Sequence, residues 1–269
     1  MKNNTSKIFS IDKIIDDKKI YFYKKLPNFI QNFIKSLLHE KEVNELLFLY
    51  KDEPPEQFFT KIIDHFQISI NLDCKYKLDQ NKRYIFVCNH PTGILDGIVV
   101  LKTLSNNFDC RIIANDIISN LHNLDKILLP IDWIGSMSKK QALKIIETLE
   151  SDKQLILFPA GEVSKITSFR IQDNKWNNFF IKKAKQYNRD IVPIYISGHN
   201  SIWFYLIYII RYTFRIKFNL EMFLLIHELF NKKKHEINLK FGNPISFQSL
   251  KNKNLNEECN KIQKAIYYL

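Results

Sequence analysis

The sequence predicts an α/β fold in which helices flank a central, mostly parallel sheet, with a helical segment in front of it. From residue 68 onward, short β-branched runs alternate with amphipathic stretches, which is the pattern of strands joined by crossover helices. Before that point, apolar residues recur at the spacing of a helix. The length of 269 residues is near the limit of about 250–300 at which one hydrophobic core stops growing. We therefore expect an N-terminal helical segment over residues 1–57 and one α/β domain over residues 58–269.

The N-terminal segment is expected to contain helices that a pair of prolines interrupts. Residues 26–38 carry one apolar stripe, and residues 42–50 continue the pattern. Pro54 and Pro55 then end the second helix, because proline lacks the N–H that an inner turn requires. A short helix is expected over residues 58–66. Such helices can pack on the sheet or lie on a bilayer, and the sequence leaves both open.

The rest of the chain is expected to alternate between strands and helices. The expected strands are at residues 68–72, 84–88, 111–114, 154–158, 191–196 and 236–241. The expected helices are at residues 94–105, 139–149, 176–187 and 202–212. In parallel sheets the loops at the carboxyl ends of the strands carry the binding and catalytic residues. Polar residues that directly follow a strand are therefore the first candidates for a site.

The composition indicates a basic protein that can meet an acidic partner. The formal net charge is +12 and the isoelectric point is about 9.3, which fits nucleic acid, an anionic membrane surface or an acidic carrier protein. Heavy use of lysine throughout the chain can also supply this charge without any partner. The 4 cysteines are far apart and form no CxxC pair, which argues against a zinc site or a disulfide scaffold and favours a reducing compartment.

The sequence predicts contact with a membrane surface but no spanning helix. Spanning requires about 20 mostly apolar residues, and the longest apolar run, residues 202–210, ends at Arg211. No apolar signal-peptide core is visible near the N-terminus, so a cytoplasmic protein is expected. Aromatic residues such as Trp203 and Tyr212 are mixed with basic ones such as Arg215 in this region, a combination suited to the headgroup boundary of an anionic membrane. A core helix whose arginines reach toward water explains the same residues equally well.

The first candidate motif follows the strand at residues 84–88 and pairs His90 with Asp96. On a regular helix these two residues would face apart, about 240° around the axis. Pro91 and Gly93 permit a turn that returns the carboxylate to the imidazole, although Pro91 also suits the first position of a helix. A carboxylate on one ring nitrogen leaves the other free to act as a base. Taken alone, the pair is also explained by an ordinary turn, and no third metal ligand is near.

The second candidate motif follows the strand at residues 154–158 and reads Phe-Pro-Ala-Gly-Glu-Val-Ser over residues 158–164. A mostly cationic loop comes after it, which can receive an anionic or zwitterionic headgroup. The polar and aromatic residues of this loop are Lys165, Arg170, Asp173, Lys175 and Trp176. A solvated loop with ordinary charges is the alternative.

Together with a third segment, these motifs resemble those of the glycerolipid and lysophospholipid acyltransferase superfamily. The likeness is closest to its hemolysin-like and ornithine-lipid-type branch, which carries Asn-His-Pro-Thr-Gly-x-x-Asp-Gly, Phe-Pro-Ala-Gly-Glu-Val-Ser and Ile-x-Gly-x-Asn-Ser. In this chain the motifs occupy residues 89–97, 158–164 and 196–201, in the same order. The resemblance covers roughly residues 58–247 and implies an acyltransferase domain over residues 58–269.

The resemblance implies transfer of a fatty acyl group from acyl carrier protein or coenzyme A to a lysolipid-type hydroxyl at the cytoplasmic face of the membrane. His90 would act as general base and Asp96 would orient it, with no cofactor and no metal. Donors to the oxyanion are expected after His90 or in the turn at residues 159–161. The residues expected to bind substrates are Asn89, Thr92, Gly93, Phe158, Pro159, Gly161, Glu162, Ser164, Lys165 and Arg170.

The chain departs from the wider superfamily at positions that concern the acceptor. The superfamily usually spaces its His and Asp by four residues, whereas five lie between His90 and Asp96, as in the hemolysin-like branch. Ala160 and Val163 replace the Glu and Arg that the superfamily associates with gripping glycerol phosphate. A plain glycerol 3-phosphate or lysophosphatidic acid acceptor is therefore doubtful. Glu162, Lys165 and Arg170 are the candidates for a substitute grip.

Other functions are less well supported by the residues. Cys88 lies two positions before His90 and could act as a nucleophile, but a cysteine that closes an apolar strand is more often a buried small hydrophobe. The chain lacks a Gly-x-Ser-x-Gly motif, which disfavours an α/β-hydrolase esterase. A basic nucleic-acid-binding protein would explain the charge, yet no such signature is present and the lysines are dispersed. An inert lipid-binding member of the same fold would not require the His–Asp pair.

Overall fold

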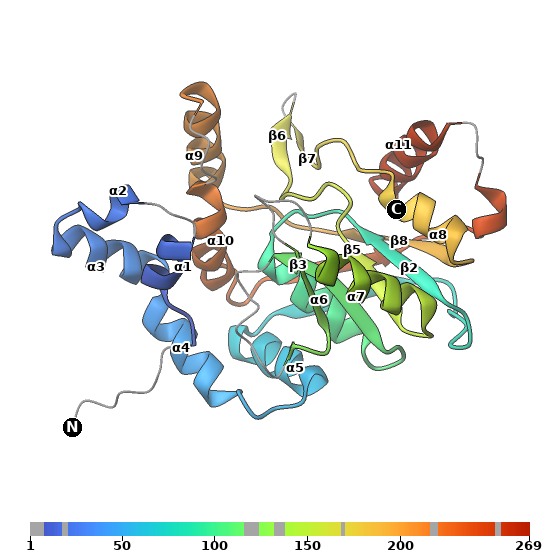
Figure 1. Cartoon of the computed structure of the whole chain (residues 1–269), viewed down its shortest axis with the longest axis horizontal. Helices are drawn as coiled ribbons and strands as arrows, with labels where there is room; N and C mark the ends of the chain where they lie inside the picture. Colours follow the sequence, from blue (N-terminus) through green and yellow to red (C-terminus); the bar gives the residue numbers. More distant parts are fainter. Residues whose placement is uncertain are drawn as a thin grey trace.

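A computed structural model describes residues 8–17, 21–115, 124–131, 138–167, 170–215, 220–250 and 254–269. In this part of the chain, a central seven-stranded sheet lies between helices, as the sequence predicts (Figure 1). The order across the sheet is β1-β9-β8-β2-β5-β3-β4. Its strands are β1 (Ser69–Cys74), β2 (Tyr84–Cys88), β3 (Cys110–Asn115), β4 (Leu128–Ile131), β5 (Gln154–Leu157), β8 (Asp190–Ile196) and β9 (Glu236–Phe241).

The sheet is mostly parallel, which confirms the expected fold class. Every neighbouring pair of strands described in this sheet runs parallel except β8 and β9. β4 is a strand that the sequence pattern missed. Its residues read Leu-Leu-Pro-Ile, and a proline inside a short run argues against a strand. The proline is tolerated here because β4 stands at the end of the sheet, where one side needs no partner.

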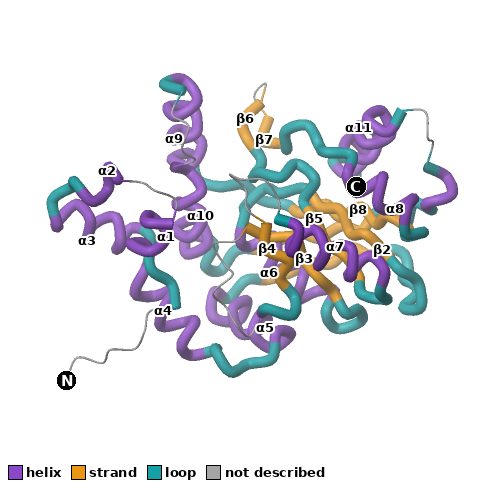
Figure 2. Tube along the Cα trace, viewed as in Figure 1, coloured by secondary structure: helices purple, strands orange, loops and turns teal. Residues whose placement is uncertain are grey.

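Helices cover both faces of the sheet (Figure 2). α5 (Pro55–Phe66) and α6 (Ile94–Leu104) supply the hydrophobic core of one face. On the other face the core comes from α7 (Lys139–Glu150), α8 (Phe179–Gln186) and α11 (Leu255–Ile266). β2 is buried along its whole length, with Phe86 and Cys88 in the first core and Ile85 and Val87 in the second. This strand therefore has the most fixed position from which a site can be built.

The N-terminal helices pack on the rest of the molecule to different degrees. They are α1 (Ile11–Asp17), α2 (Tyr21–Lys24), α3 (Asn28–Leu37) and α4 (Glu40–Leu49). α4 places Leu46 in the core beside α5, whereas α3 has no buried residue. Ile11 and Tyr23 form a small cluster against Phe223 of α10 (Leu220–Asn231). The boundary at residue 57 stays a prediction.

Several expected boundaries move because side chains found tertiary partners. The helix expected at residues 176–187 begins only at Phe179, since Trp176 is buried in the core before it. The loop expected after residue 164 holds a short antiparallel hairpin, β6 (Lys165–Thr167) and β7 (Arg170–Gln172). α9 (Ile202–Thr213) forms where a helix was expected and projects from the body of the molecule (Figure 1). Among the residues described, no helix combines the length and apolarity needed to cross a membrane.

Arg189 joins the end of α7 to the sheet. Its guanidinium is buried and donates to the carbonyl oxygens of Leu149 at 3.0 Å, Thr148 at 3.0 Å and Lys153 at 2.7 Å, and also to that of Ser151. Burial lowers the pKa of this group to about 10, which still leaves it charged at neutral pH. A cation at the carboxyl end of a helix also faces the negative pole of the helix dipole.

Replacing Arg189 with Met is expected to destabilise the fold by about 3 kcal/mol, because several buried carbonyls lose their donors at once. The change in the free energy of unfolding can be measured by urea denaturation followed by circular dichroism. Arg189→Lys retains the charge but has fewer N–H donors, so its free energy of unfolding should lie between those of Arg189→Met and the wild type. Equal stability of Arg189→Met and the wild type would contradict this account.

Candidate active site

His90 and Asp96 come together at the carboxyl end of β2. The Nδ1 atom of His90 lies 2.9 Å from Oδ2 of Asp96. The Asp96 side chain is fully buried, whereas 18% of the His90 side chain stays exposed. A carboxylate at Nδ1 favours the tautomer with the proton on that nitrogen, which leaves Nε2 as an acceptor. The geometry therefore provides an imidazole that can take up a proton from a bound molecule.

The turn between the two residues is built around the Asp96 carboxylate. Its Oδ2 accepts the backbone N–H groups of Thr92 and Gly93, each at 2.8 Å, and its Oδ1 accepts the Thr92 hydroxyl at 2.5 Å. Gly93 has a φ of +88°, which favours glycine. α6 accordingly begins at Ile94, as expected for the helix at residues 94–105, and Pro91 lies in the turn before it. The two N–H groups nearest His90 are engaged by Asp96 and are not free for a substrate oxyanion.

The second motif folds around the other side of His90. The Phe158 ring stacks on the imidazole, with ring centroids 4.1 Å apart and an interplanar angle of 20°. The Ser164 N–H donates to the carbonyl of His90 at 2.8 Å. Gly161, with a φ of +76°, closes the turn by donating its N–H to the Phe158 carbonyl at 2.9 Å. Residues far apart in the sequence thus fix one face of the imidazole.

The third motif, at the end of β8, is hydrogen-bonded to the loop that carries His90. The Asn89 amide pairs with the backbone of Ile196, donating to its carbonyl at 2.8 Å and accepting its N–H at 2.7 Å. Gly198 has a φ of +118°, and a Cβ atom there would come within 3.1 Å of the Thr92 methyl group. Asn89 therefore positions His90 through the backbone and does not line the cavity described below.

Asp173 is a central residue whose role the sequence did not reveal. Its Oδ1 accepts the His90 N–H at 3.1 Å and the Ser164 hydroxyl at 2.5 Å, while its Oδ2 accepts the Trp176 indole N–H at 2.8 Å. Burial raises the pKa of this carboxyl, and the donated hydrogen bonds oppose that rise. In the sequence it is one more charge in a polar loop. Only the fold shows that it ties the His90 backbone to the second motif.

The residues expected to form a substitute binding site for the acceptor, Glu162, Lys165 and Arg170, do not come together as a free cationic site. Lys165 is buried, with Nζ 3.2 Å from Glu221 and 3.9 Å from Glu162, and burial lowers its pKa. Glu221 of α10 also pairs with Arg211 of α9 at 2.8 Å. Arg170 lies exposed on β7, at the far end of the hairpin from Lys165. The charge of Lys165 is therefore already neutralised by carboxylates of the protein.

The position at which the superfamily carries an Arg has a packing role here. Val163 is buried against Phe204 and Tyr205 of α9 and Leu225 of α10. A charged side chain in this apolar contact would lose its hydration without a partner. The α9–α10 pair thus covers the loop on which the phosphate-binding Arg is expected in the wider superfamily.

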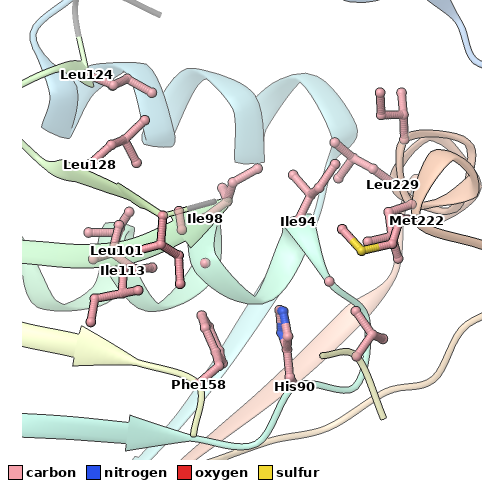
Figure 3. A pocket seen from close by; sticks show the side chains of 18 of the residues that line it. His90, Ile94, Ile98, Leu101, Ile113, Leu124, Leu128, Phe158, Met222 and Leu229 are labelled. Atoms are coloured by element: carbon pink, nitrogen blue, oxygen red, sulfur yellow. The ribbon is translucent and has the colours of Figure 1, made fainter. Parts of the chain in front are cut away.

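A largely apolar cavity of about 680 Å³ adjoins the His90 imidazole (Figure 3). Figure 3 shows His90 and Phe158 pointing into it, with Ile94, Ile98 and Leu101 of α6 along its side. α10, α4, α5 and β3 also contribute to the wall, as do Phe158, Pro159, Ala160, Gly161, Glu162 and Val163 of the second motif. A volume of this size suits a flexible apolar chain.

Cys88 is poorly suited to be a nucleophile. Its side chain is fully buried in the core, and burial raises the pKa of its thiol well above the usual range. The buried-hydrophobe reading of this cysteine therefore fits the structure better. No group of His, Cys, Asp and Glu residues in the described part of the chain is arranged to hold a metal ion.

Comparisons with known proteins agree with the fold and with the family that the motifs resemble. A family model described as Acyltransferase matches residues 13–269. The chain is 29% identical to a lyso-glycine lipid O-acyltransferase of Bacteroides thetaiotaomicron over the full length of both, and 30% identical to a protein of the same description from Phocaeicola vulgatus, covering 93% of this chain and 90% of the relative. The crystal structure of the 1-acyl-sn-glycerophosphate (LPA) acyltransferase PlsC from Thermotoga maritima superposes with a TM-score of 0.50, at 11% identity, over 88% of this chain and 96% of PlsC.

The isosteric change Asp173→Asn is expected to lower the free energy of unfolding by about 1–3 kcal/mol, because its amide N–H₂ must face another donor on one side. Thermal and urea denaturation measure this loss. Asp73→Asn, which alters an exposed carboxylate on β1, serves as the matched control and should change stability by no more than about 0.5 kcal/mol. If both variants unfold like the wild type, Asp173 does not stabilise the site.

Proposed function

Because this chain belongs to the acyltransferase family, within the glycerolipid acyltransferase superfamily, we propose that it acylates the hydroxyl of a lyso-amino-acid lipid, with an acyl-thioester as donor. The activity of the family, lipid acyl transfer, fits the two relatives and the fold. The donor, the acceptor and the roles of individual residues are the content of the proposal. Assignment to the hemolysin-like branch stays a prediction.

The position of the His90–Asp96 pair at an apolar cavity carries the proposal. A fatty acyl chain that fills the cavity would leave its thioester carbonyl beside His90. Burial of the chain supplies binding energy of about 0.8 kcal/mol per CH₂ group. An inert lipid-binding protein would also need the cavity, but it would not need an imidazole oriented by a buried carboxylate.

In the proposed reaction, Nε2 of His90 takes the proton of the acceptor hydroxyl as its oxygen attacks the thioester carbonyl carbon. The tetrahedral intermediate then collapses, the carbon–sulfur bond breaks, and the imidazolium returns the proton to the leaving thiolate. Asp96 stabilises the imidazolium. Within the described residues, no hydrogen bond engages the backbone N–H groups of Ala160, Glu162 or Val163, which border the cavity. We infer that the oxyanion is stabilised there.

The acceptor is proposed to lack a phosphate group. Val163 is buried by α9 and α10, Ala160 has no charge, and Lys165 is paired with Glu221. Nothing in this arrangement supplies the bidentate cation that phosphate favours. The relatives described as lyso-glycine lipid O-acyltransferases make a lyso-glycine lipid the first acceptor to test.

The donor is proposed to be an acyl carrier protein or coenzyme A thioester. An acidic carrier complements the net charge of +12. Since such carriers are cytoplasmic and the acceptor is a lipid, we place the reaction at the cytoplasmic face of a membrane. The family match favours this function over the nucleic-acid-binding alternative.

His90→Ala is expected to reduce kcat for acyl transfer by about 10²–10⁴-fold, the usual contribution of a general base. The assay follows the acylated product by mass spectrometry, with acyl-thioester donor and either lyso-glycine lipid or lysophosphatidic acid. Cys88→Ala is the matched control and should stay active, since its thiol is not a nucleophile. Full activity of His90→Ala, or a preference for lysophosphatidic acid, would refute the corresponding part of the proposal.

Ala114→Phe is expected to shorten the preferred acyl chain, because a ring at this cavity-lining position on β3 occupies space that the chain needs. We expect kcat/KM for the longest accepted donor to fall about tenfold or more relative to shorter donors. Ile98→Leu, which keeps the volume of a lining residue on α6, is the comparison and should leave the chain-length profile unchanged. An unchanged profile in Ala114→Phe would show that the acyl chain lies elsewhere.

A further inference from the structure

α9 exposes apolar side chains on the side where an ordinary surface helix exposes polar ones. Its inner face combines the buried rings of Phe204 and Tyr205 with two polar residues, Tyr208 and Arg211. Arg211 pairs with Glu221, and Lys165 lies 4.3 Å from the centre of the Tyr208 ring. Its outer face is apolar. A helix on a water-soluble surface has the opposite arrangement, with polar residues outward.

Exposed apolar side chains recur along α9 from its first residue to the residue after its end. Three of its aromatic side chains are among the most exposed in the described chain, with Trp203 at 69%, Tyr212 at 73% and Phe214 at 73%. The spacing of the other members follows the turns of the helix, so they form one surface. This α9 face consists of Ile202, Trp203, Leu206, Ile209, Ile210, Tyr212 and Phe214. A contiguous exposed patch of this kind marks a site of interaction with a membrane or a protein.

We propose that the α9 face docks the enzyme on an anionic lipid bilayer, with the helix lying in the headgroup boundary. Twelve residues make a helix of about 18 Å, too short to cross a hydrocarbon core of about 30 Å but long enough to lie along it. Trp203 and Tyr212 stand near the two ends of the helix, and both side chains favour the boundary between lipid and water. Exposed Arg215 follows the helix, and the net charge of +12 favours an anionic surface. Figure 1 shows that α9 stands clear of the sheet, where a flat surface can reach it.

Docking at α9 would bring the cavity next to the membrane. α9 packs on α10 through Phe204, Tyr205 and Leu225, and Leu225 also lines the cavity beside His90. A lipid acceptor leaving the bilayer along α9 would therefore meet the wall of the cavity first. Delivery of the acceptor along α9 rests on the proposed acyl transfer. Docking of α9 on the bilayer does not depend on that proposal.

The test is flotation of the purified protein with vesicles of phosphatidylcholine alone or mixed with phosphatidylglycerol. Wild type is expected to float with the anionic vesicles, and more weakly as salt is raised. The triple variant Trp203→Ser, Ile210→Ser, Phe214→Ser should lose vesicle binding by about tenfold or more. Because these side chains are exposed, the variant should unfold at the same denaturant concentration as the wild type.

Two control variants separate α9 from other exposed apolar residues. Leu143→Ser alters α7, and Phe29→Ser combined with Phe33→Ser alters α3, which also exposes aromatic residues. Both should retain wild-type binding to the anionic vesicles. Loss of binding in the α3 variant but not in the α9 variant would overturn the assignment. A wild type that ignores vesicles but self-associates through the α9 face would overturn it as well.

Activity toward a detergent-dispersed acceptor distinguishes failure of docking from failure of the proposed function. The α9 triple variant should keep wild-type activity in detergent and lose it on vesicles. If the wild type floats yet transfers no acyl group to any lyso-lipid in detergent, the proposed function is wrong and the docking surface stands. Equal activity of the α9 variant and the wild type on vesicles would show that α9 does not deliver the acceptor.

Discussion

A carboxylate removed from water must be paired, and Asp96 meets this requirement with four hydrogen bonds that it accepts within one turn of chain. They come from the backbone of Thr92 and Gly93, the hydroxyl of Thr92 and the imidazole of His90. Those donors can converge only if residues 91–93 leave the strand as a tight turn instead of opening a helix. The direction of the imidazole is therefore a consequence of satisfying one buried charge.

Residues around the His90–Asp96 pair also satisfy buried polar groups, with partners that are farther apart in the sequence. Asp173 is also buried, and its acceptors are filled by the His90 backbone, Ser164 and Trp176. Asn89 is tied to the end of β8. These contacts hold the loop through the His90 backbone N–H and the Asn89 side chain, so they leave free the side of the ring that faces the cavity. Rigid support of this kind preorganises a base for its reaction.

The apolar cavity and the apolar outer face of α9 both fit a lipid substrate that is embedded in a bilayer. Side chains of α6 and α10 line part of the cavity next to His90, and α9 turns its one charged residue, Arg211, inward against Glu221. The packing of α9 on α10 has a direct consequence for the acceptor. Where the wider superfamily carries an Arg for phosphate, the chain has Val163, and the α9–α10 pair covers it. α9, whose outer face is apolar, thus acts with α10 to close the position at which a phosphate would be held.

The sequence by itself determined the alternation of strands and helices and the strand ends that carry the motifs, because these follow from local periodicity and residue type. It also indicated His90 and Asp96 as the candidate pair, by their residue types and by the resemblance of the motifs. It missed β4, whose proline is tolerated only at the end of a sheet. It could not show that Asp173 supports His90 or that Lys165 is neutralised by Glu221, 56 residues away. Those pairings depend on which buried charges meet after the chain has packed. Spacing along the sequence carries no information about that, so only the tertiary structure decided it.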